Sequence, residues 1–179
     1  MSLQITTNPV DLRKPCLPCE TIEEGLEICD QLSQALTDSL VLGIGLAANQ
    51  IGIQKRVCLL RVPETDSQGF RYTVELKLIN PKVSGLQRPV IFNQEGCLSF
   101  PGKTVRTLRY TRCVVIDDLE PEGRELIGMR AICAQHETSH LDSQTMFDVI
   151  FDDIKPNASC PCGSGERFKK CCRLAAKEI

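Results

Sequence analysis

The sequence predicts an α+β fold in which antiparallel strands pack around a helix that carries both histidines of the chain. Three observations support this fold class. A helical pattern covers residues 22–40, segments rich in strand-forming residues follow between residues 56 and 118, and a second helical pattern runs over residues 127–141. A helix, then a run of strands, then a helix is the element order typical of α+β domains.

The first helix is expected to begin after Thr21, because Thr21-Ile22-Glu23-Glu24 has the spacing of a capping box. Apolar side chains then recur every three or four residues, which is the periodicity of a helix with one buried face. They are Ile22, Leu26, Cys29, Leu32, Leu36 and Leu40. Gly43-Ile44-Gly45 is expected to break the helical pattern.

The strands are indicated by β-branched residues and by alternation of apolar with polar residues. Residues 56–62 form a short apolar run, and residues 72–78 alternate up to Asn80-Pro81. Further strands are expected near residues 89–93, 104–110 and 112–118, and a turn at Glu120-Pro121-Glu122-Gly123.

Length and composition suit one globular domain with a small appendage. The chain has 179 residues, 42% hydrophobic and 25% charged residues, and a net charge of −2. This charge gives no general attraction to nucleic acid or anionic membrane. No apolar run is long enough to span a bilayer, and residues 1–7 show no secretory signal. We therefore expect a cytoplasmic protein without membrane contact.

A boundary is expected after residue 155, because the segment around Pro156 is polar and contains a helix-breaker. Residues 1–155 would form the main domain, and residues 156–179 a small, basic and cysteine-dense tail.

Both histidines of the chain, His136 and His140, are four residues apart. On a helix, positions i and i+4 lie on one face, so both imidazoles can bind one metal ion. Glu137 between them can then act as general base on a water that the metal activates. The alternative is an accidental helical spacing. The preceding apolar residues argue against it, because they share a stripe with the histidines and turn them to the core: Leu126, Met129, Ile132 and Cys133.

Catalytic zinc or iron sites usually take three protein ligands and keep one position open. Because the chain has no third histidine, a carboxylate or a thiolate must complete the set. The best candidate segment is Glu95-Gly96-Cys97-Leu98-Ser99, where Gly96 allows close backbone approach and Cys97 can present a thiolate. Taken alone, such a cysteine is more often a small core residue.

A third segment, residues 43–50, is rich in glycine and alanine and ends in Gln50. It lacks the features of a phosphate loop and of a dinucleotide fingerprint. A backbone that packs tightly against a substrate explains it better, and the Gln50 amide can donate a hydrogen bond to an oxyanion.

Together the three segments resemble peptide deformylases. That family carries a glycine- and alanine-rich loop ending in Gln, a Glu-Gly-Cys-apolar-Ser segment and a His-Glu-apolar-Asp-His helix, which match residues 43–50, 95–99 and 136–140 in this order. The resemblance covers about residues 2–153. It implies the deformylase fold and removal of the N-formyl group from the initiator methionine of nascent chains. It also includes Asp11-Leu12-Arg13, Ile79-Asn80-Pro81 and Gln135.

The resemblance implies a catalytic divalent metal held by Cys97, His136 and His140. Fe(II) is the ion that the family prefers, and Ni, Co or Zn can substitute for it. A thiolate ligand donates more charge than a histidine, which suits a redox-active metal. Glu137 would be the general base and then the acid that passes a proton to the departing amine.

The resemblance also implies which groups meet the substrate. The Gln50 amide and the backbone N–H of Leu98 would stabilise the oxyanion, and loss of one such donor typically costs about 10²–10³ in rate. Arg109 falls where the family places an arginine, and we assign it no role here. The substrate-binding residues would be Gly43, Ile44, Gly45, Ile132 and Cys133.

Two positions depart from the family pattern. Thr138 replaces an apolar residue and Ser139 replaces the Asp, whose loss as a hydrogen-bond partner can cost about 10–100-fold in metal affinity or activity. Asp142 could compensate, although it lies on a different face of the helix. Two alternatives stay open: a catalytically silent homologue that acts through its tail, and a different metallopeptidase, against which Cys97 argues.

Eleven cysteines are an odd number, whereas a disulfide framework is usually even, so we expect a reducing compartment. Cys16 and Cys19 have CxxC spacing without a partner pair and are interpreted as an ordinary loop. Four others are expected to fill the core or the pocket: Cys29, Cys58, Cys113 and Cys133.

The tail holds four cysteines within residues 160–172, namely Cys160, Cys162, Cys171 and Cys172. They can close around one structural Zn²⁺, whereas the alternative, a disulfide knot, is awkward for two adjacent cysteines. The pattern resembles the SEC-C zinc-binding motif.

The tail is also basic, which an ordinary solvated face would explain. The alternative is docking to the ribosome or to another protein or RNA partner. The basic residues are Arg167, Lys169, Lys170, Arg173 and Lys177.

Overall fold

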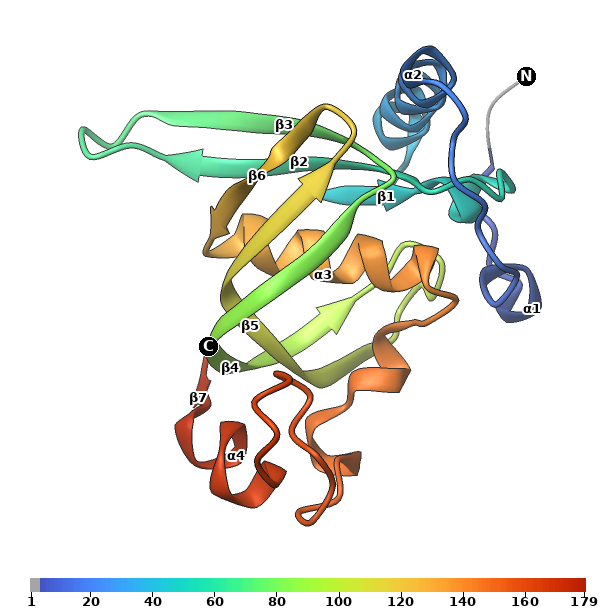
Figure 1. Cartoon of the computed structure of the whole chain (residues 1–179). Coiled ribbons are helices and arrows are strands. Elements are labelled where there is room, and N and C mark those ends of the chain that lie inside the picture. Colours follow the sequence, from blue (N-terminus) through green and yellow to red (C-terminus); the bar gives the residue numbers. More distant parts are fainter. Residues whose placement is uncertain (1–3) are drawn as a thin grey trace.

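The computed structural model describes residues 4–179 and shows two sheets with one helix between them (Figure 1). Residues 1–3, which we predicted to belong to the main domain, lie outside the described residues. Helix α3 (Met129–Leu141) lies in the centre and contacts strands of both sheets. The predicted α+β class with antiparallel strands around this helix is confirmed.

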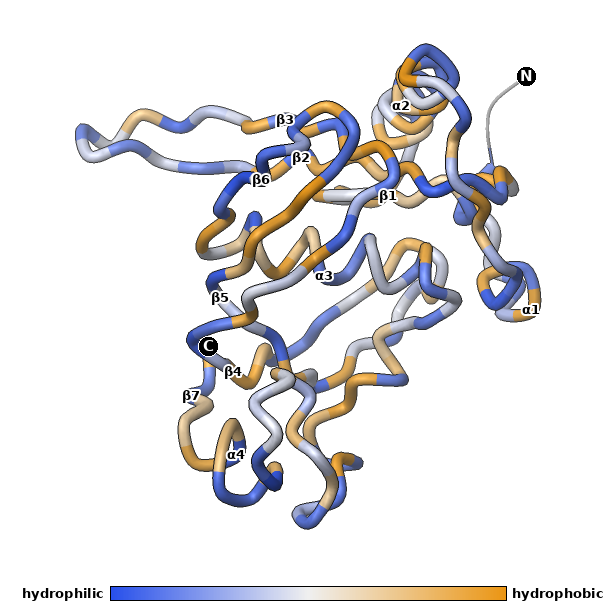
Figure 2. The backbone as a smooth tube through the Cα atoms, viewed as in Figure 1, coloured by the Kyte–Doolittle hydropathy of each residue, from blue (hydrophilic) through white to orange (hydrophobic). Residues whose placement is uncertain are grey.

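The first sheet has the strand order β1-β2-β3, and both pairings are antiparallel. Its strands are β1 (Gly45–Ala47), β2 (Val57–Thr65) and β3 (Arg71–Ile79). The loop predicted at residues 43–50 therefore contains a short edge strand. The projecting end of the β2–β3 hairpin is mostly hydrophilic (Figure 2).

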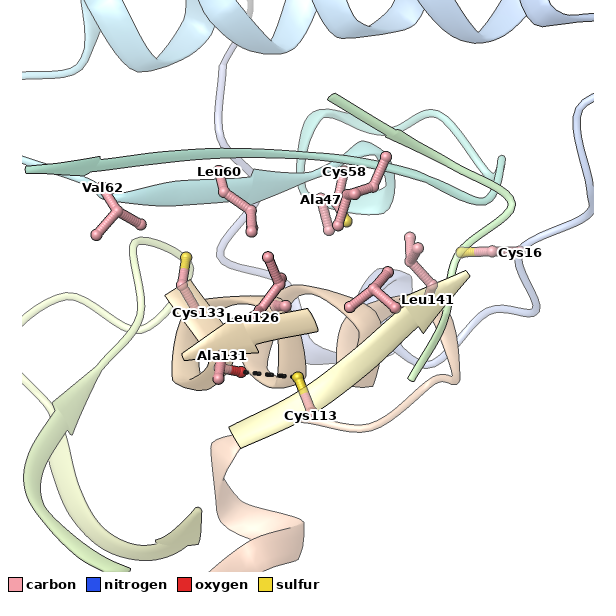
Figure 3. Close-up of a cluster of buried hydrophobic side chains, with 13 residues drawn as sticks. Cys16, Ala47, Cys58, Leu60, Val62, Cys113, Leu126, Ala131, Cys133 and Leu141 are labelled. Atoms are coloured by element: carbon pink, nitrogen blue, oxygen red, sulfur yellow. Dashed lines mark hydrogen bonds between the residues drawn. The ribbon is translucent and has the colours of Figure 1, made fainter. Parts of the chain in front are cut away.

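Residues 57–60 and residue 62 of β2 are buried, and they lie on both faces of the sheet, to which successive side chains point in turn, whereas the last three residues of the strand are not buried. Cys58, Leu60 and Val62 face α3 and share a buried cluster with its residue Cys133 (Figure 3). Val57 and Leu59 pack instead with the apolar residues of helix α2 (Ile22–Asp38). The first sheet thus separates two layers of core.

Helix α2 begins as predicted. The Thr21 side chain accepts a hydrogen bond from the Glu24 N–H at 3.2 Å. The Glu24 carboxylate accepts from the N–H of Glu20, one residue before the expected cap. The helix ends at Asp38, so Leu40 is fully exposed and the prediction that it extends the buried stripe is wrong.

The second sheet has the order β6-β5-β4-β7. Its strands are β4 (Lys82–Gly96), β5 (Thr104–Asp117), β6 (Glu120–Ile127) and β7 (Lys177–Glu178). The two strands predicted at 104–110 and 112–118 are one continuous strand. The turn predicted at residues 120–123 is wrong, because the chain already reverses at Asp117, whose side chain accepts from the Leu119 N–H at 2.9 Å.

Helix α3 is buried on most sides, as expected for a helix enclosed between two sheets. Of the residues predicted to share a buried face of this helix, Ile132, Cys133 and His140 are buried, but Met129 at the start of the helix is 38% exposed. Among residues 4–179, no helix is long and apolar enough to cross a bilayer.

The tail packs against the second sheet, on the side away from α3 (Figure 1). Its last strand, β7, pairs in parallel with β4. Short helical turns connect the remaining parts of the chain. They are α1 (Pro9–Leu12), η1 (Ala48–Ile51), η2 (Met146–Val149), η3 (Phe151–Asp153), η4 (Phe168–Lys170) and α4 (Cys172–Ala175).

Candidate metal centre and active site

Three of the predicted metal ligands meet at one point. The donor atoms of Cys97, His136 and His140 all lie within 4.8 Å of one another. The Cys97 Sγ atom is 3.3 Å from His140 Nε2, and the two imidazole centroids are 5.0 Å apart. One thiolate and two imidazoles this close together fit a single divalent ion with bonds of about 2.0–2.3 Å.

Two chain segments bring these ligands together. Cys97 follows the end of β4, where the chain turns and the Phe100 N–H donates to the Cys97 carbonyl at 2.9 Å. His136 and His140 project from one face of α3, one helical turn apart. The strand end therefore presents the thiolate to the helix that carries the imidazoles.

A buried carboxylate, Glu95, supports the first imidazole. Its Oε1 atom lies 2.6 Å from His136 Nδ1 and accepts from Arg109 Nη2 at 2.6 Å. Its Oε2 atom accepts from Arg109 Nε at 2.9 Å and from the Thr107 hydroxyl. Burial alone would raise the pKa of Glu95, but Arg109 and His136 lower it by more than burial raises it. The pKa therefore lies well below its usual range, and the group stays ionised.

Sequence reasoning named neither Glu95 nor Arg109 as a functional residue. A signal was present only at Arg109, which stands between Leu108 and Tyr110 within a predicted strand. Arg109 is 3% exposed and forms a two-pronged ion pair with the carboxylate. Buried charges of opposite sign on adjacent strands are expected to pair.

The second imidazole, His140, is in a different environment. Burial is the main cause that lowers its pKa well below the usual value, so the ring is neutral and free to bind a metal. Its Nδ1 atom has no hydrogen-bond partner among residues 4–179. The support that Glu95 gives to His136 therefore has no counterpart at His140.

The residues that depart from the family pattern do not supply a hydrogen-bond partner for His140 Nδ1. The Ser139 hydroxyl donates to the Gln135 carbonyl at 2.6 Å, and the Thr138 hydroxyl donates to the Ala134 carbonyl at 2.7 Å. Asp142 forms an ion pair with Arg56 at 2.8 Å on the protein surface. The expectation that Asp142 compensates for Ser139 is not supported.

Glu137 is 4% exposed and lines a cavity of about 490 Å³ beside the ligands. Burial raises its pKa to about 7. Its Oε2 atom has no hydrogen-bond partner within the described chain. A Cβ atom on Gly45 would lie 2.5 Å from Glu137 Oε1, so only glycine leaves room for this carboxylate. A buried, unpaired carboxyl of nearly neutral pKa is suited to move protons.

The orientation of the Gln50 amide is fixed by its neighbours. Its Oε1 atom accepts from the Ala47 N–H at 2.9 Å, which turns the Nε2 donors toward Ser99 Oγ at 3.1 Å and Cys97 Sγ at 3.5 Å. The Leu98 N–H donates to no protein acceptor among residues 4–179. Two hydrogen-bond donors thus lie beside the thiolate.

Apolar side chains form part of the cavity wall. The five residues predicted to bind substrate all line it. Leu98, predicted only as a backbone donor, lines it too, and so do Phe100 and Met129, for which no substrate contact was predicted. The predicted set is Gly43, Ile44, Gly45, Ile132 and Cys133.

The four tail cysteines form a second cluster whose sulfur atoms also lie within 4.8 Å of one another. Cys162 Sγ is 3.4 Å from Cys160 Sγ and 3.6 Å from Cys171 Sγ. Gly163 and Gly165 adopt φ angles of 79°, which glycine tolerates and which turn the chain back toward Cys171. All eleven cysteines are free thiols in the structure.

Comparison with known proteins identifies both parts. A family model for polypeptide deformylase matches residues 3–155, and one for the SEC-C motif matches residues 157–174. The chain belongs to the polypeptide deformylase family. The resemblance found in the sequence is thereby confirmed, and the family uses a catalytic metal.

Individual deformylases agree with this assignment. A peptide deformylase from Cellvibrio japonicus is 32% identical over 148 residues, covering 78% of this chain and 80% of the relative. The structure of a probable peptide deformylase from Synechococcus phage S-SSM7 matches with a TM-score of 0.67 and 33% identity, covering 83% and 100% of the two chains. The deformylase from Ehrlichia chaffeensis gives a TM-score of 0.67 at 29% identity, covering 84% and 88%.

Proposed function

We propose that the protein is a metal-dependent hydrolase that removes the N-formyl group from the formyl-methionine of nascent polypeptides. The observation that carries this proposal is the position of Glu137, an unpaired buried carboxyl beside the cluster of Cys97, His136 and His140. Family membership supplies the reaction type, and this cluster supplies the groups that the reaction requires.

Cys97, His136 and His140 would hold the metal. When bound, it would polarise the formyl carbonyl and make a water molecule acidic enough to ionise near neutral pH. Because one ligand is a thiolate, we favour Fe(II), with Ni, Co or Zn as substitutes. Exposure to air should then inactivate an iron form faster than a nickel or zinc form.

The residues of the chain would move the proton and stabilise the charge. Glu137 accepts a proton from water as the water oxygen bonds to the formyl carbon. The Gln50 amide and the Leu98 N–H donate to the carbonyl oxygen as it becomes negative. Glu137 then returns the proton to the amine nitrogen as the C–N bond breaks, which leaves formate and a free N-terminus.

The apolar part of the cavity would bind the methionine side chain. Ile44 and Ile132 supply branched apolar walls, and Cys133 is held in place by a hydrogen bond from its thiol to the Ile44 carbonyl at 3.2 Å. The backbone at Gly43 and Gly45 would lie close to the peptide.

For the tail we propose a structural Zn²⁺ bound by Cys160, Cys162, Cys171 and Cys172. Burial raises the pKa of Cys162, but hydrogen bonds from Ser164 and the neighbouring thiols lower it to about 6 overall. One thiolate is thus available at neutral pH, and the metal would ionise the others. The tail would start after residue 155. Its basic face would dock to the ribosome or to another partner in the cytoplasm.

The test is turnover of a formyl-Met tripeptide by protein purified without oxygen and reconstituted with Fe(II), Ni(II) or Zn(II). Glu137→Gln keeps the size of the side chain and should reduce kcat by about 10²–10⁴ while the metal stays bound. Glu122→Gln, an exposed carboxylate of β6, is the matched control and should retain full activity.

A second candidate is a catalytically silent deformylase homologue that acts through its tail. The unsupported Nδ1 of His140 favours it, because loss of such a partner weakens metal sites. Absence of turnover with a filled metal site would establish this second reading and overturn the first.

A further inference from the structure

Strand β5 connects the two cysteine-containing clusters. Successive side chains of a strand point to opposite faces of the sheet. Thr107 and Arg109 hold Glu95 on the active-site face. Leu108 and Tyr110 share a buried cluster with the tail on the other face. Residues 106–110 therefore contact the active site with one face of the strand and the tail with the other.

The tail is fixed to this stretch by apolar and polar contacts. Phe168 and Cys172 are buried against Leu108 and Tyr110. The Tyr110 hydroxyl lies 3.6 Å from the Cys172 sulfur. Arg106 forms ion pairs with Asp152 at 2.9 Å and with Glu178 at 2.8 Å, so the chain before and after the cysteines is bound to the same strand.

Tyr110 also connects directly to the metal helix. Its backbone N–H donates to Gln135 Oε1 at 3.1 Å, and its carbonyl accepts from Gln135 Nε2 at 2.7 Å. Gln135 directly precedes His136. These two hydrogen bonds between one side chain and one backbone position fix both the distance and the rotation of the helix relative to the strand.

The packing of the tail depends on its cysteines. Its regular elements, η4 and α4, have only three and four residues, which is too short to be stable alone. Three pairs of these sulfurs lie 3.4, 3.6 and 3.9 Å apart, and such contacts are weak hydrogen bonds at most. A metal that ties the sulfurs together supplies folding free energy that the apolar residues alone do not.

We propose that the metal-filled cysteine cluster of the tail positions the catalytic centre through Tyr110 and Gln135. The tail is then a functional layer of the deformylase domain, and its metal content sets the geometry at His136. Tyr110 and Gln135 are positioning residues in this proposal, since neither belongs to the ligand set. The proposal rests on the structural zinc proposed above for the tail.

The experiment uses the full chain with Ni(II) at the catalytic centre and Zn(II) in the tail. X-ray absorption at the nickel edge then reports on the catalytic centre alone, and amide hydrogen exchange reports on residues 106–110. The first variant is Cys162→Ser, which removes a tail ligand that is only partly buried and lies at the edge of the cluster of Leu108 and Tyr110. Lys169→Gln, an exposed change in the same tail, is the control.

For Cys162→Ser we expect loss of the zinc, faster amide exchange at residues 106–110, an altered nickel-edge spectrum, and a kcat lower by about 5-fold or more. Tyr110→Phe keeps the ring and all four cysteines. It should retain both metals, release zinc faster to a chelator and show faster exchange at residue 110. Lys169→Gln should match the wild type in every measurement.

The proposal is overturned if Cys162→Ser loses its zinc while amide exchange at residues 106–110 and the nickel-edge spectrum stay as in the wild type. If the wild-type tail binds no zinc, the proposed tail site fails and the coupling fails with it. If the wild type shows no deformylation but zinc still controls the exchange and the spectrum, the coupling stands and the proposed activity fails.

Discussion

Glu95 Oε1 lies 2.6 Å from His136 Nδ1, so one buried carboxylate sets the orientation of a predicted metal ligand. An ionised carboxylate only accepts hydrogen bonds, so Nδ1 must carry the hydrogen. Burial lowers the pKa of His136, but hydrogen bonds to Cys97 and Glu95 raise it to about 10 overall, so a metal must displace the proton at Nε2. The hydrogen bond at Nδ1 then makes the ring a stronger donor. Arg109 keeps this carboxylate charged although it is 3% exposed.

Arg109→Met is therefore expected to destabilise both the fold and the metal site. It leaves Glu95 without its cation, and breaking a buried pair in this way costs about 3–5 kcal/mol. Weaker support of His136 should lower metal affinity by about 10–100-fold. Urea unfolding and competition with a chelator measure the two effects.

Arg112→Met is the matched control for this prediction. Arg112 lies on the same strand and pairs with Glu125 at 2.6 Å, but both side chains are more than one third exposed. Exposed pairs of this kind contribute about 0–1 kcal/mol. Equal losses for the two variants would show that burial does not give the Arg109 pair a special role.

Gln50→Ala should lower kcat by about 10²–10³, because it removes one oxyanion donor. Metal content should stay the same, since Gln50 is not among the three ligands. Ser99→Ala provides the comparison. It removes a neighbour of the Gln50 amide, but the Ala47 N–H still fixes the amide, so the loss should be much smaller. If both variants kept the wild-type kcat in steady-state kinetics at equal metal loading, the role of Gln50 as an oxyanion donor would be contradicted.

The pKa of Glu137 predicts the pH dependence of activity. Burial raises this pKa to about 7, and only the ionised form can accept a proton. The value of kcat/KM should therefore fall as the pH falls below about 7. A bound cation favours the carboxylate and moves this limb to lower pH. A profile that rises toward acid would show that Glu137 is not the base.

The same raised pKa predicts a pH effect on stability. Between its ordinary value of 4.5 and about 7, Glu137 binds a proton in the folded metal-free protein but not in the unfolded chain. Its contribution to the free energy of unfolding is thus present below pH 4.5 and is lost as the pH rises to 7. Glu137→Gln should remove this dependence, so the stability difference between variant and wild type should grow across that range in urea titrations.

The sequence was most informative where a residue type is tied to local chemistry or to periodicity. The spacing of His136 and His140 predicted their common face, and Thr21 predicted the start of α2. Glu120 was misassigned to a turn because proline and glycine nearby resemble turn residues, whereas β6 tolerates Pro121 and Gly123 at the edge of the sheet.

Contacts across the sheet could not be derived from local patterns. The pairing of Glu95 with Arg109 depends on the register of β4 and β5, which contains a bulge between Phe92 and Glu95. Gln94 in this bulge has a φ of 57°, and such irregularities re-aim the side chains that follow. The burial of Cys172 against Tyr110 likewise depends on tertiary packing across 62 residues of chain.

Charge on the tail predicts salt-dependent binding to RNA of the ribosome. None of Arg167, Lys169 and Lys170 forms an ion pair within residues 4–179, and all three are exposed. If they contact phosphates, changing all three to Gln should lower the slope of log K against log salt by about 2–3, because each contact contributes about 0.7–0.9. Changing Arg71, Lys82 and Arg88, exposed residues of the main domain, removes the same charge and should leave the slope unchanged. Equal slopes for the two triple variants in ribosome co-sedimentation would mean that net charge, and not the face of the tail, governs binding.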